Sequence, residues 1–307
     1  FEARLYAEDV PAGFLPATGT LTHLDFPEQA RADSGVRAGD EISPFYDPMI
    51  AKVITYGPTR DVALSRLSQA LADTEVAGTV TNLAFLGALA GHDGFMRGEV
   101  DTGLIGRDLE ALTAAPDPQP RHAVAAAMAL TGLDTGGDMT GFSLWQPLRR
   151  AVQLACGDDV LDIHVEVLGS DAQAWHVDGT TVQAHRRQGT WIIDGRPAPN
   201  TSIAGDVITV FDQYGIAYRA IDLLDVTAGA VGDGNLIEAP MPGLVKAVFT
   251  APGAKVAKGD RLAMLEAMKM EHALLALRDG IVAEVLVSQG DQVSAGAALV
   301  RLEDADT

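Results

Sequence analysis

The chain has 307 residues, a formal net charge of −20 and one cysteine. This acidic balance argues against binding to nucleic acid or to an anionic membrane surface, since both favour clustered basic side chains. One cysteine excludes an internal disulfide, no Cys/His cluster has the spacing of a metal site, and no apolar run approaches the ~20 residues of a membrane-spanning helix.

The first segment (1–113) mixes strand-like and helical stretches, which predicts an α+β unit. FEARLYAE, GTLTHLDF and MIAKVITYG are strand-like. TRDVALSRLSQALADT has apolar residues close to helical spacing, with Thr59 or Asp61 as the N-cap. VTNLAFLGALAGH predicts a second helix, capped by Thr81 or Asn82.

A proline-rich stretch, LTAAPDPQPRH, predicts a linker before the second segment (121–226). This segment begins with one helical run, RHAVAAAMALTG, and continues as short strand-like runs separated by turn pairs. The pattern predicts an antiparallel β-barrel or sandwich with one helix. His164, His176 and His185 fall in these strands, and their spacing matches no metal pattern, so we expect structural or surface roles.

A second linker, DVTAGAVGDGN, precedes the third segment (235–304), which repeats itself after 37 residues. Glycines, valines and leucines recur at this offset: Gly243 and Gly280, Val245 and Val282, Gly253 and Gly290, Val256 and Val293, Gly259 and Gly296, Leu262 and Leu299. Two copies of a unit too small to bury its own apolar face predict a pseudo-twofold β-sandwich.

The stretch LEAMKMEH lies where the first copy ends, so Lys269 is expected in the turn that joins the two halves. Only five lysines occur in the chain, and this one stands between Met268 and Met270. By itself, a lysine in a turn is most simply a solvated side chain. Its flanking residues argue for a specific role.

The sequence EAMKM, with APMPG upstream and DGIV downstream, resembles the biotin attachment sequence of biotin carboxyl carrier domains. The resemblance covers the whole third segment. It implies a flattened β-sandwich of the biotinyl/lipoyl type, biotin attached covalently to Lys269 between Met268 and Met270, and a biotin protein ligase as a transient partner. Lipoyl domains share this fold but lack methionines on both sides of their lysine.

EARLYAED, RADSGVRAGDEISPFYDPMIAK and TEVAGTVTNLAFL in the first segment resemble the C-terminal part of biotin carboxylase, an ATP-grasp enzyme that uses ATP, Mg²⁺ and bicarbonate. The resemblance implies that Arg31 is catalytic and contacts biotin and bicarbonate. A guanidinium suits this role because it binds oxyanions through directed donors; the alternative is a surface ion pair. The phosphate loop and other catalytic residues of the family lie upstream of Phe1, so we expect the ATP-grasp front part to be missing from this chain, which alone should not hydrolyse ATP.

The order of the three segments resembles the α subunit of acyl-CoA carboxylases, a family of C–C bond-forming ligases. In that family the middle domain docks onto a separate carboxyltransferase β subunit, which implies a hetero-oligomer. The best match is 3-methylcrotonyl-CoA carboxylase, which acts in leucine degradation, with propionyl-CoA and geranyl-CoA carboxylases as alternatives. A non-enzymatic lipoyl-like interaction module is the remote alternative. The expected location is the cytoplasm, or the mitochondrial matrix in a eukaryote.

Overall fold

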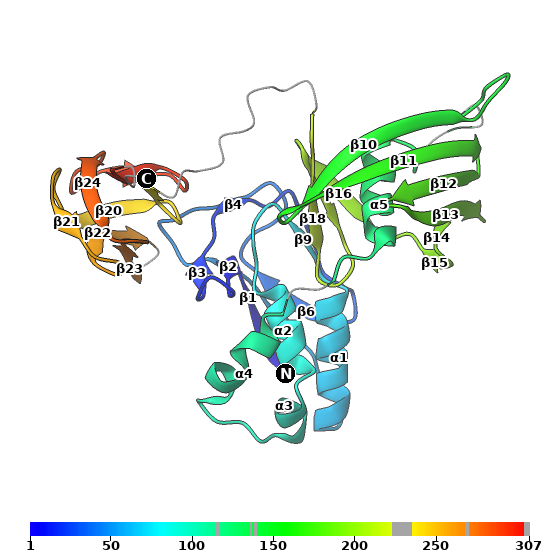
Figure 1. The fold of residues 1–307 in the computed structure, drawn as a ribbon. Coiled ribbons are helices and arrows are strands. Elements are labelled where there is room, and N and C mark those ends of the chain that lie inside the picture. The colour runs from blue at the N-terminus through cyan, green and yellow to red at the C-terminus, as the bar shows by residue number, and fades with distance from the viewer. Residues whose placement is uncertain (115–116, 136, 138–139, 223–234, 268–269, 304–307) are drawn as a thin grey trace.

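The computed structural model of the chain has three lobes, each with its own hydrophobic core (Figure 1). The residues that it describes are 1–114, 117–135, 137, 140–222, 235–267 and 270–303. None of the helices in these ranges is long and apolar enough to cross a membrane.

The first lobe is an antiparallel sheet of order β1-β8-β6 covered by helices. Its strands are β1 (Glu2–Tyr6), β2 (Glu8–Asp9), β3 (Leu15–Pro16), β4 (Gly19–Thr20), β5 (His23–Asp25), β6 (Arg31–Ser34), β7 (Glu41–Ile42), β8 (Met49–Ile54) and β9 (Glu75–Ala77). Its helices are α1 (Arg60–Ala72), α2 (Leu83–Ala90), α3 (Asp93–Arg97) and α4 (Leu104–Leu112). Helix α1 contacts β8 and α2 contacts β1, so the buried leucines of both helices close the core over this sheet.

The two predicted helix starts behave differently. Thr59 caps α1 as expected, since its side chain accepts a hydrogen bond from the backbone N–H of Val62. Asn82 precedes α2, but its side chain makes no capping bond. Its Oδ1 accepts from the Tyr6 N–H at 2.9 Å, and its Nδ2 donates to the Arg4 carbonyl at 3.3 Å. Asn82 therefore satisfies the edge of β1 and ties α2 to the sheet.

The second lobe is one antiparallel sheet of nine strands that curves around a single helix, α5 (Pro120–Thr131) (Figure 1). The strand order is β15-β14-β13-β12-β11-β10-β18-β17-β16. The bounds are β10 (Leu148–Cys156), β11 (Asp159–Gly169), β12 (Ala172–Val177), β13 (Thr180–Arg187), β14 (Thr190–Ile193), β15 (Arg196–Pro197), β16 (Thr201–Ala204), β17 (Val207–Val210) and β18 (Ile216–Ala220). Because β15 and β16 are its two edges, the predicted barrel is an open half-barrel.

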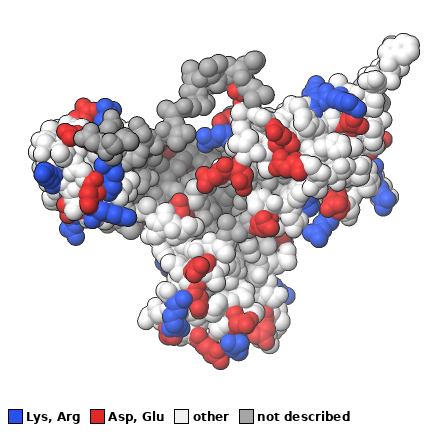
Figure 2. All heavy atoms as spheres, viewed as in Figure 1, with Lys and Arg blue, Asp and Glu red and all other residues white. Residues whose placement is uncertain are grey.

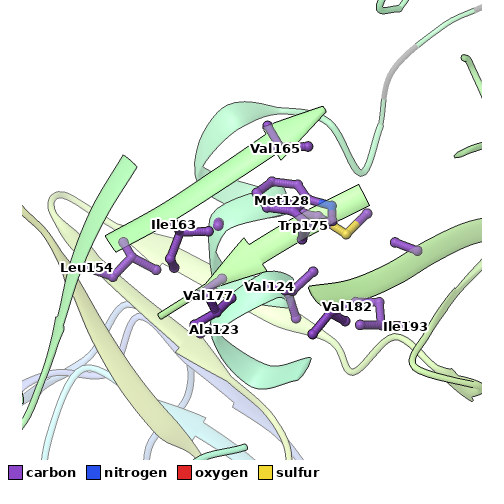
Figure 3. Close-up of a cluster of buried hydrophobic side chains, with 14 of the residues drawn as sticks. Ala123, Val124, Met128, Leu154, Ile163, Val165, Trp175, Val177, Val182 and Ile193 are labelled. Carbon is purple, nitrogen blue, oxygen red and sulfur yellow. The ribbon is translucent and has the colours of Figure 1, made fainter. Parts of the chain in front are cut away.

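Helix α5 is buried on all sides, which explains why its sequence is apolar without a polar stripe. Every residue from 121 to 128 is buried, and the helix contacts eight of the nine strands. Figure 3 shows Met128 next to Trp175, and Val124, one turn earlier on the same face of the helix, next to Val182. Small alanine side chains over much of the helix surface let the sheet approach closely.

A charged cluster holds the N-terminal end of α5 to the sheet. Arg121 and His122 are almost completely buried, and both contact the Asp212 carboxylate in the loop between β17 and β18. Arg121 also donates to the Pro197 carbonyl at 2.8 Å. The His122 Nδ1 accepts from the Gln119 N–H at 3.1 Å, so a neutral ring carries its proton on Nε2, 3.2 Å from Asp212.

The third lobe is a sandwich of two four-stranded sheets, β19-β26-β24-β21 and β23-β22-β20-β25. Its strands are β19 (Leu236–Glu238), β20 (Gly243–Val248), β21 (Lys255–Val256), β22 (Arg261–Ala267), β23 (Met270–Leu275), β24 (Gly280–Val285), β25 (Gln292–Val293) and β26 (Ala298–Leu302). A shift of 37 residues exchanges the two sheets strand for strand, so the predicted pseudo-twofold sandwich is confirmed. Gly253 and Gly290 have φ of 82° and 95°, so the same left-handed turn recurs in both halves.

The environment of His122 predicts an acid-sensitive middle lobe. Burial lowers the pKa of His122 although Asp212 opposes this effect. The unfolded chain therefore takes up the proton first, and the corresponding stability is lost as the pH falls below ~6.5. The substitution His122→Gln replaces the histidine with a side chain that does not titrate. Glutamine is also typical of the third helical position of a capping box, which His122 occupies in α5. His122→Gln should therefore lose less stability between pH 7.5 and 5.5 than the wild type.

Tryptophan fluorescence provides the measurement, because Trp145, Trp175 and Trp191 are the chain's three tryptophans and all lie in this lobe. Urea unfolding at the two pH values would give the free energy of unfolding of the middle lobe. An identical loss of stability in wild type and variant would contradict the assigned role of His122.

Candidate functional site

The two strands that bracket Lys269 form a tightly paired hairpin. Strand β22 ends at Ala267, β23 begins at Met270, and these two residues are directly paired, as are Glu266 and Glu271. Met268 and Lys269, which connect them, lie outside the described residues. The biotin attachment predicted at Lys269 between Met268 and Met270 therefore remains a prediction, but the hairpin expected around it is present.

The sandwich holds the base of this hairpin firmly. Strand β22 is central in its sheet, between β23 and β20. Leu265 on β22 and Val245 on β20 are fully buried, and Leu274 on β23 is nearly so. On the exposed side, Lys246 Nζ lies 3.2 Å from Glu266 Oε2. The connection at 268–269 is thus carried on strands that are fixed by packing.

The internal symmetry places this hairpin away from the chain connections of the lobe. Under the 37-residue shift, β22 and β23 correspond to β26 and β19, the last and first strands of the sandwich. The hairpin β22–β23 therefore lies in one sheet of the sandwich and the first and last strands, β19 and β26, lie in the other.

Arg31, the predicted catalytic residue, begins β6 in the first lobe, opposite Ile54 of β8. Its side chain is 73% exposed and forms a two-pronged pair with Asp33, with Nε–Oδ1 at 2.8 Å and Nη2–Oδ2 at 2.9 Å. The Arg31 hydrogen bond lowers the pKa of Asp33, although partial burial opposes this, and the same bond raises the pKa of Arg31. The ion pair considered for Arg31 exists, and it orients the guanidinium while leaving Nη1 outside the pair.

Asp33 also faces a second cation, because Lys52 Nζ on β8 lies 3.6 Å from its Oδ2. The described residues therefore present Arg31 and Lys52 together on the outside of the three-stranded sheet. The single Asp33 carboxylate is shared between Arg31 and Lys52, so two cationic groups face one anionic group. This surface can therefore bind a further anion. Arg31 and the β22–β23 hairpin lie in different lobes, so the structure does not bring the two predicted sites together.

The sequence interpretation missed an exposed apolar patch in the loop before β10. Phe142, Leu144 and Trp145 are 66%, 77% and 92% exposed. Gly141 holds the loop against the sheet with φ of 73°, and a Cβ there would lie 2.2 Å from Val167 Cγ1. The signal was available in GFSLWQ, where apolar residues cluster between turn residues without helical or strand periodicity. No group of three potential metal ligands occurs among the residues that the structure describes.

Comparison with known families matches two of the three lobes. Residues 2–107 match the biotin carboxylase C-terminal domain, and residues 235–302 match the biotin-requiring enzyme domain. The chain contains a biotin carboxylase C-terminal domain and a biotin/lipoyl domain. The half-barrel between them is referred to below as the middle domain.

Similar proteins extend over all three domains. The mitochondrial methylcrotonoyl-CoA carboxylase subunit alpha of Dictyostelium discoideum is 32% identical over 322 residues, which cover 91% of this chain and 45% of that protein. The corresponding Rattus norvegicus subunit is 31% identical over 99% of this chain and 47% of its own length. The mitochondrial propionyl-CoA carboxylase alpha chain of Homo sapiens is 30% identical, over 98% and 46%. The chain thus spans about half the length of the curated relatives it matches, and these relatives are biotin-dependent carboxylases.

A conservative pair of variants separates the structural and catalytic interpretations of Arg31. If Arg31 is catalytic, as the resemblance to biotin carboxylase implies, Arg31→Gln in the full-length protein should lower ATP-dependent carboxylation of free biotin about 100-fold or more, since an oriented cation at a developing negative charge typically contributes this much. The unfolding midpoint should hardly change, because the pair with Asp33 is at the surface. Arg37→Gln is the matched control, since Arg37 is an exposed arginine paired with Asp40. Equal carboxylation rates in both variants would assign Arg31 to the surface ion pair alone.

Proposed function

We propose that the chain is the biotin-bearing α subunit of an acyl-CoA carboxylase, or the C-terminal part of one. The proposed reaction is ATP- and bicarbonate-dependent carboxylation of biotin on Lys269, followed by carboxyl transfer to an acyl-CoA on a separate β subunit. The supporting observation is that a biotin carboxylase C-terminal domain and a biotin/lipoyl domain flank a nine-stranded half-barrel on one chain. Relatives that match over nearly the whole of this chain are named as α subunits or α chains of carboxylases.

The biotin/lipoyl domain fits a covalently attached group. A buried β22–β23 base, with the connecting residues Met268 and Lys269 beyond it, suits a lysine that must reach other active sites. Biotin, once attached, supplies a ureido nitrogen that can accept and release a carboxyl group. A biotin protein ligase is the expected transient partner, and ATP, Mg²⁺ and bicarbonate would be used by the complete biotin carboxylase domain.

Arg31 is proposed to act at the first of the two active sites. Its guanidinium is held in one orientation by Asp33, with Lys52 nearby. An oriented cation can bind bicarbonate and stabilise negative charge that develops on the biotin oxygen.

The middle domain is proposed to bind the carboxyltransferase β subunit through the patch formed by Phe142, Leu144 and Trp145. A tryptophan that is almost fully exposed beside two other apolar side chains is typical of an interaction site. The patch follows the C-terminal end of α5, away from the first domain. The complex would be a hetero-oligomer in the cytoplasm, or in the mitochondrial matrix of a eukaryote.

We propose 3-methylcrotonyl-CoA as the substrate, which would place the enzyme in leucine degradation. Several of the matching relatives are named methylcrotonoyl-CoA carboxylase subunits. Propionyl-CoA is the second candidate, because propionyl-CoA carboxylase α chains match over nearly the whole chain. Carboxylation rates of the assembled enzyme with both acyl-CoA substrates, and with geranyl-CoA, would decide between them.

Biotin on Lys269 is tested by co-expressing the chain with a biotin protein ligase. The wild type should shift on a streptavidin gel and carry biotin on the peptide that contains Lys269, whereas Lys269→Arg should show no shift. Lys258→Arg is the matched control, an exposed lysine in the same domain. A folded wild-type chain without biotin would contradict the proposed function and would favour a lipoyl-like interaction module.

The docking patch is tested by measuring affinity for the β subunit. Trp145→Ser should weaken binding about 30-fold or more, because removing a central interface tryptophan typically costs at least ~2 kcal/mol. Val160→Ser is the control, since Val160 is 56% exposed at the opposite end of the β10–β11 hairpin. Equal affinities of the two variants would place the β-subunit interface elsewhere.

A further inference from the structure

The loop 211–215, which joins β17 to β18, reaches from the middle domain into the biotin carboxylase C-terminal domain. The Tyr214 ring packs against the core of that domain, over Gly87 on helix α2. A Cβ atom at Gly87 would lie 2.2 Å from Tyr214 Cζ and 2.3 Å from its hydroxyl oxygen. The absence of a side chain at position 87 is therefore what admits the ring.

Contacts around this ring extend across the same boundary. The Phe211 ring stacks on His23 of the first domain, with centroids 4.6 Å apart. His23 Nε2 lies 2.9 Å from Glu75 Oε2, and the other oxygen of Glu75 accepts from Asn200 Nδ2 at 2.8 Å. The Glu75 carboxylate thus contacts His23 of the first domain and Asn200 of the middle domain. The Phe211 ring of the middle domain stacks on the same histidine.

Contacts from both domains hold the loop in a backbone conformation that is unfavourable for its residues. Gln213 and Tyr214 have φ of 48° and 71°, a left-handed region that non-glycine residues rarely adopt. From its own domain the loop is held by Asp212, which binds Arg121 and His122 at the start of α5. From the other domain it is held by the Tyr214 and Phe211 contacts.

Beside the loop, the two domains leave a groove open between them. A groove of about 730 Å³ runs between them, lined by threonines 18, 20, 22, 79 and 81 on one side and by Ser202, Thr209 and Arg219 on the other, with Tyr214 and Gly215 of the loop also in its lining. The loop 211–215 and the Glu75 link thus provide specific side-chain contacts beside this groove.

We infer that the loop 211–215 locks the middle domain to the biotin carboxylase C-terminal domain, so that the two behave as one body, with Tyr214 as the positioning residue. Combined with the proposed function, on which this step rests, the lock fixes the distance between the biotin carboxylase site and the docked β subunit. Movement of the biotin group between the sites would then come from the biotin/lipoyl domain alone.

A double-mutant cycle tests the lock without any enzyme assay. Gly87→Ala lies in the first domain, yet it should lower the midpoint of the tryptophan-detected unfolding transition of the middle domain by about 2–4 °C. In a Tyr214→Ala background the same substitution should leave that midpoint unchanged, because there is no ring to displace. Gly106→Ala is the control, since a Cβ there meets nothing within 4 Å. Equal shifts in the two backgrounds, or no shift in either, would overturn the inference.

Cross-linking tests whether the two domains must separate during turnover. In a full-length Cys156→Ser background, Glu75→Cys and Asn200→Cys would be joined by a short bismaleimide. The cross-linked enzyme with its β subunit should retain at least half of the acyl-CoA carboxylation rate of the same variant before cross-linking, and more than tenfold loss would overturn the inference. Carboxylation of free biotin is measured in parallel. Absence of that reaction in the enzyme without substitutions would count against the proposed function, not the lock.

Discussion

A helix that is apolar on every side must be enclosed by other elements, and in the middle domain a single curved sheet encloses it. Helix α5 is rich in alanine and enclosed by eight strands, so its own surface dictates the curvature of the sheet. Its ends remain accessible for contacts. At a rise of ~1.5 Å per residue these ends are roughly 18 Å apart. The N-terminal end anchors the loop 211–215, and the C-terminal end leads into the loop with Phe142, Leu144 and Trp145.

The Arg121–Asp212 pair connects this core to the interdomain boundary. Arg121 is buried and carries a charge that would be costly without a partner. Asp212 supplies that partner from a loop whose neighbours Phe211 and Tyr214 contact the first domain. Burial alone would raise the pKa of Asp212, but the hydrogen bond from Arg121 and the contact with His122 lower it, so the carboxylate stays charged. The Arg121–Asp212 pair holds α5 to the loop between β17 and β18. It thereby also orients the Phe211 and Tyr214 side chains, which contact the biotin carboxylase C-terminal domain.

The sequence predicted those features that repeat or that act locally. The 37-residue offset revealed the sandwich because each copy must form the same turns, as Gly253 and Gly290 do. Thr59 was recognisable as a cap because capping acts within one helical turn. In contrast, Asn82 accepts a hydrogen bond from a residue of β1 that is 76 positions away in the sequence. Arg121 likewise donates to Asp212, which is 91 positions away. No local pattern encodes such pairs, and the contact of Tyr214 with Gly87 is equally invisible before the fold is known.

The division into two locked domains and one separate sandwich has a physical consequence for a tethered group. The effective concentration of a tethered group at a site depends on how well the tether length matches the span between anchor and site. If the first two domains rotated freely, this span would vary and the average concentration at each site would fall. The predicted linker DVTAGAVGDGN (225–235) lies between β18 and β19 in the sequence. Strand β18 directly follows the loop 211–215, so the lock that holds the two domains together also fixes the point from which the tether begins.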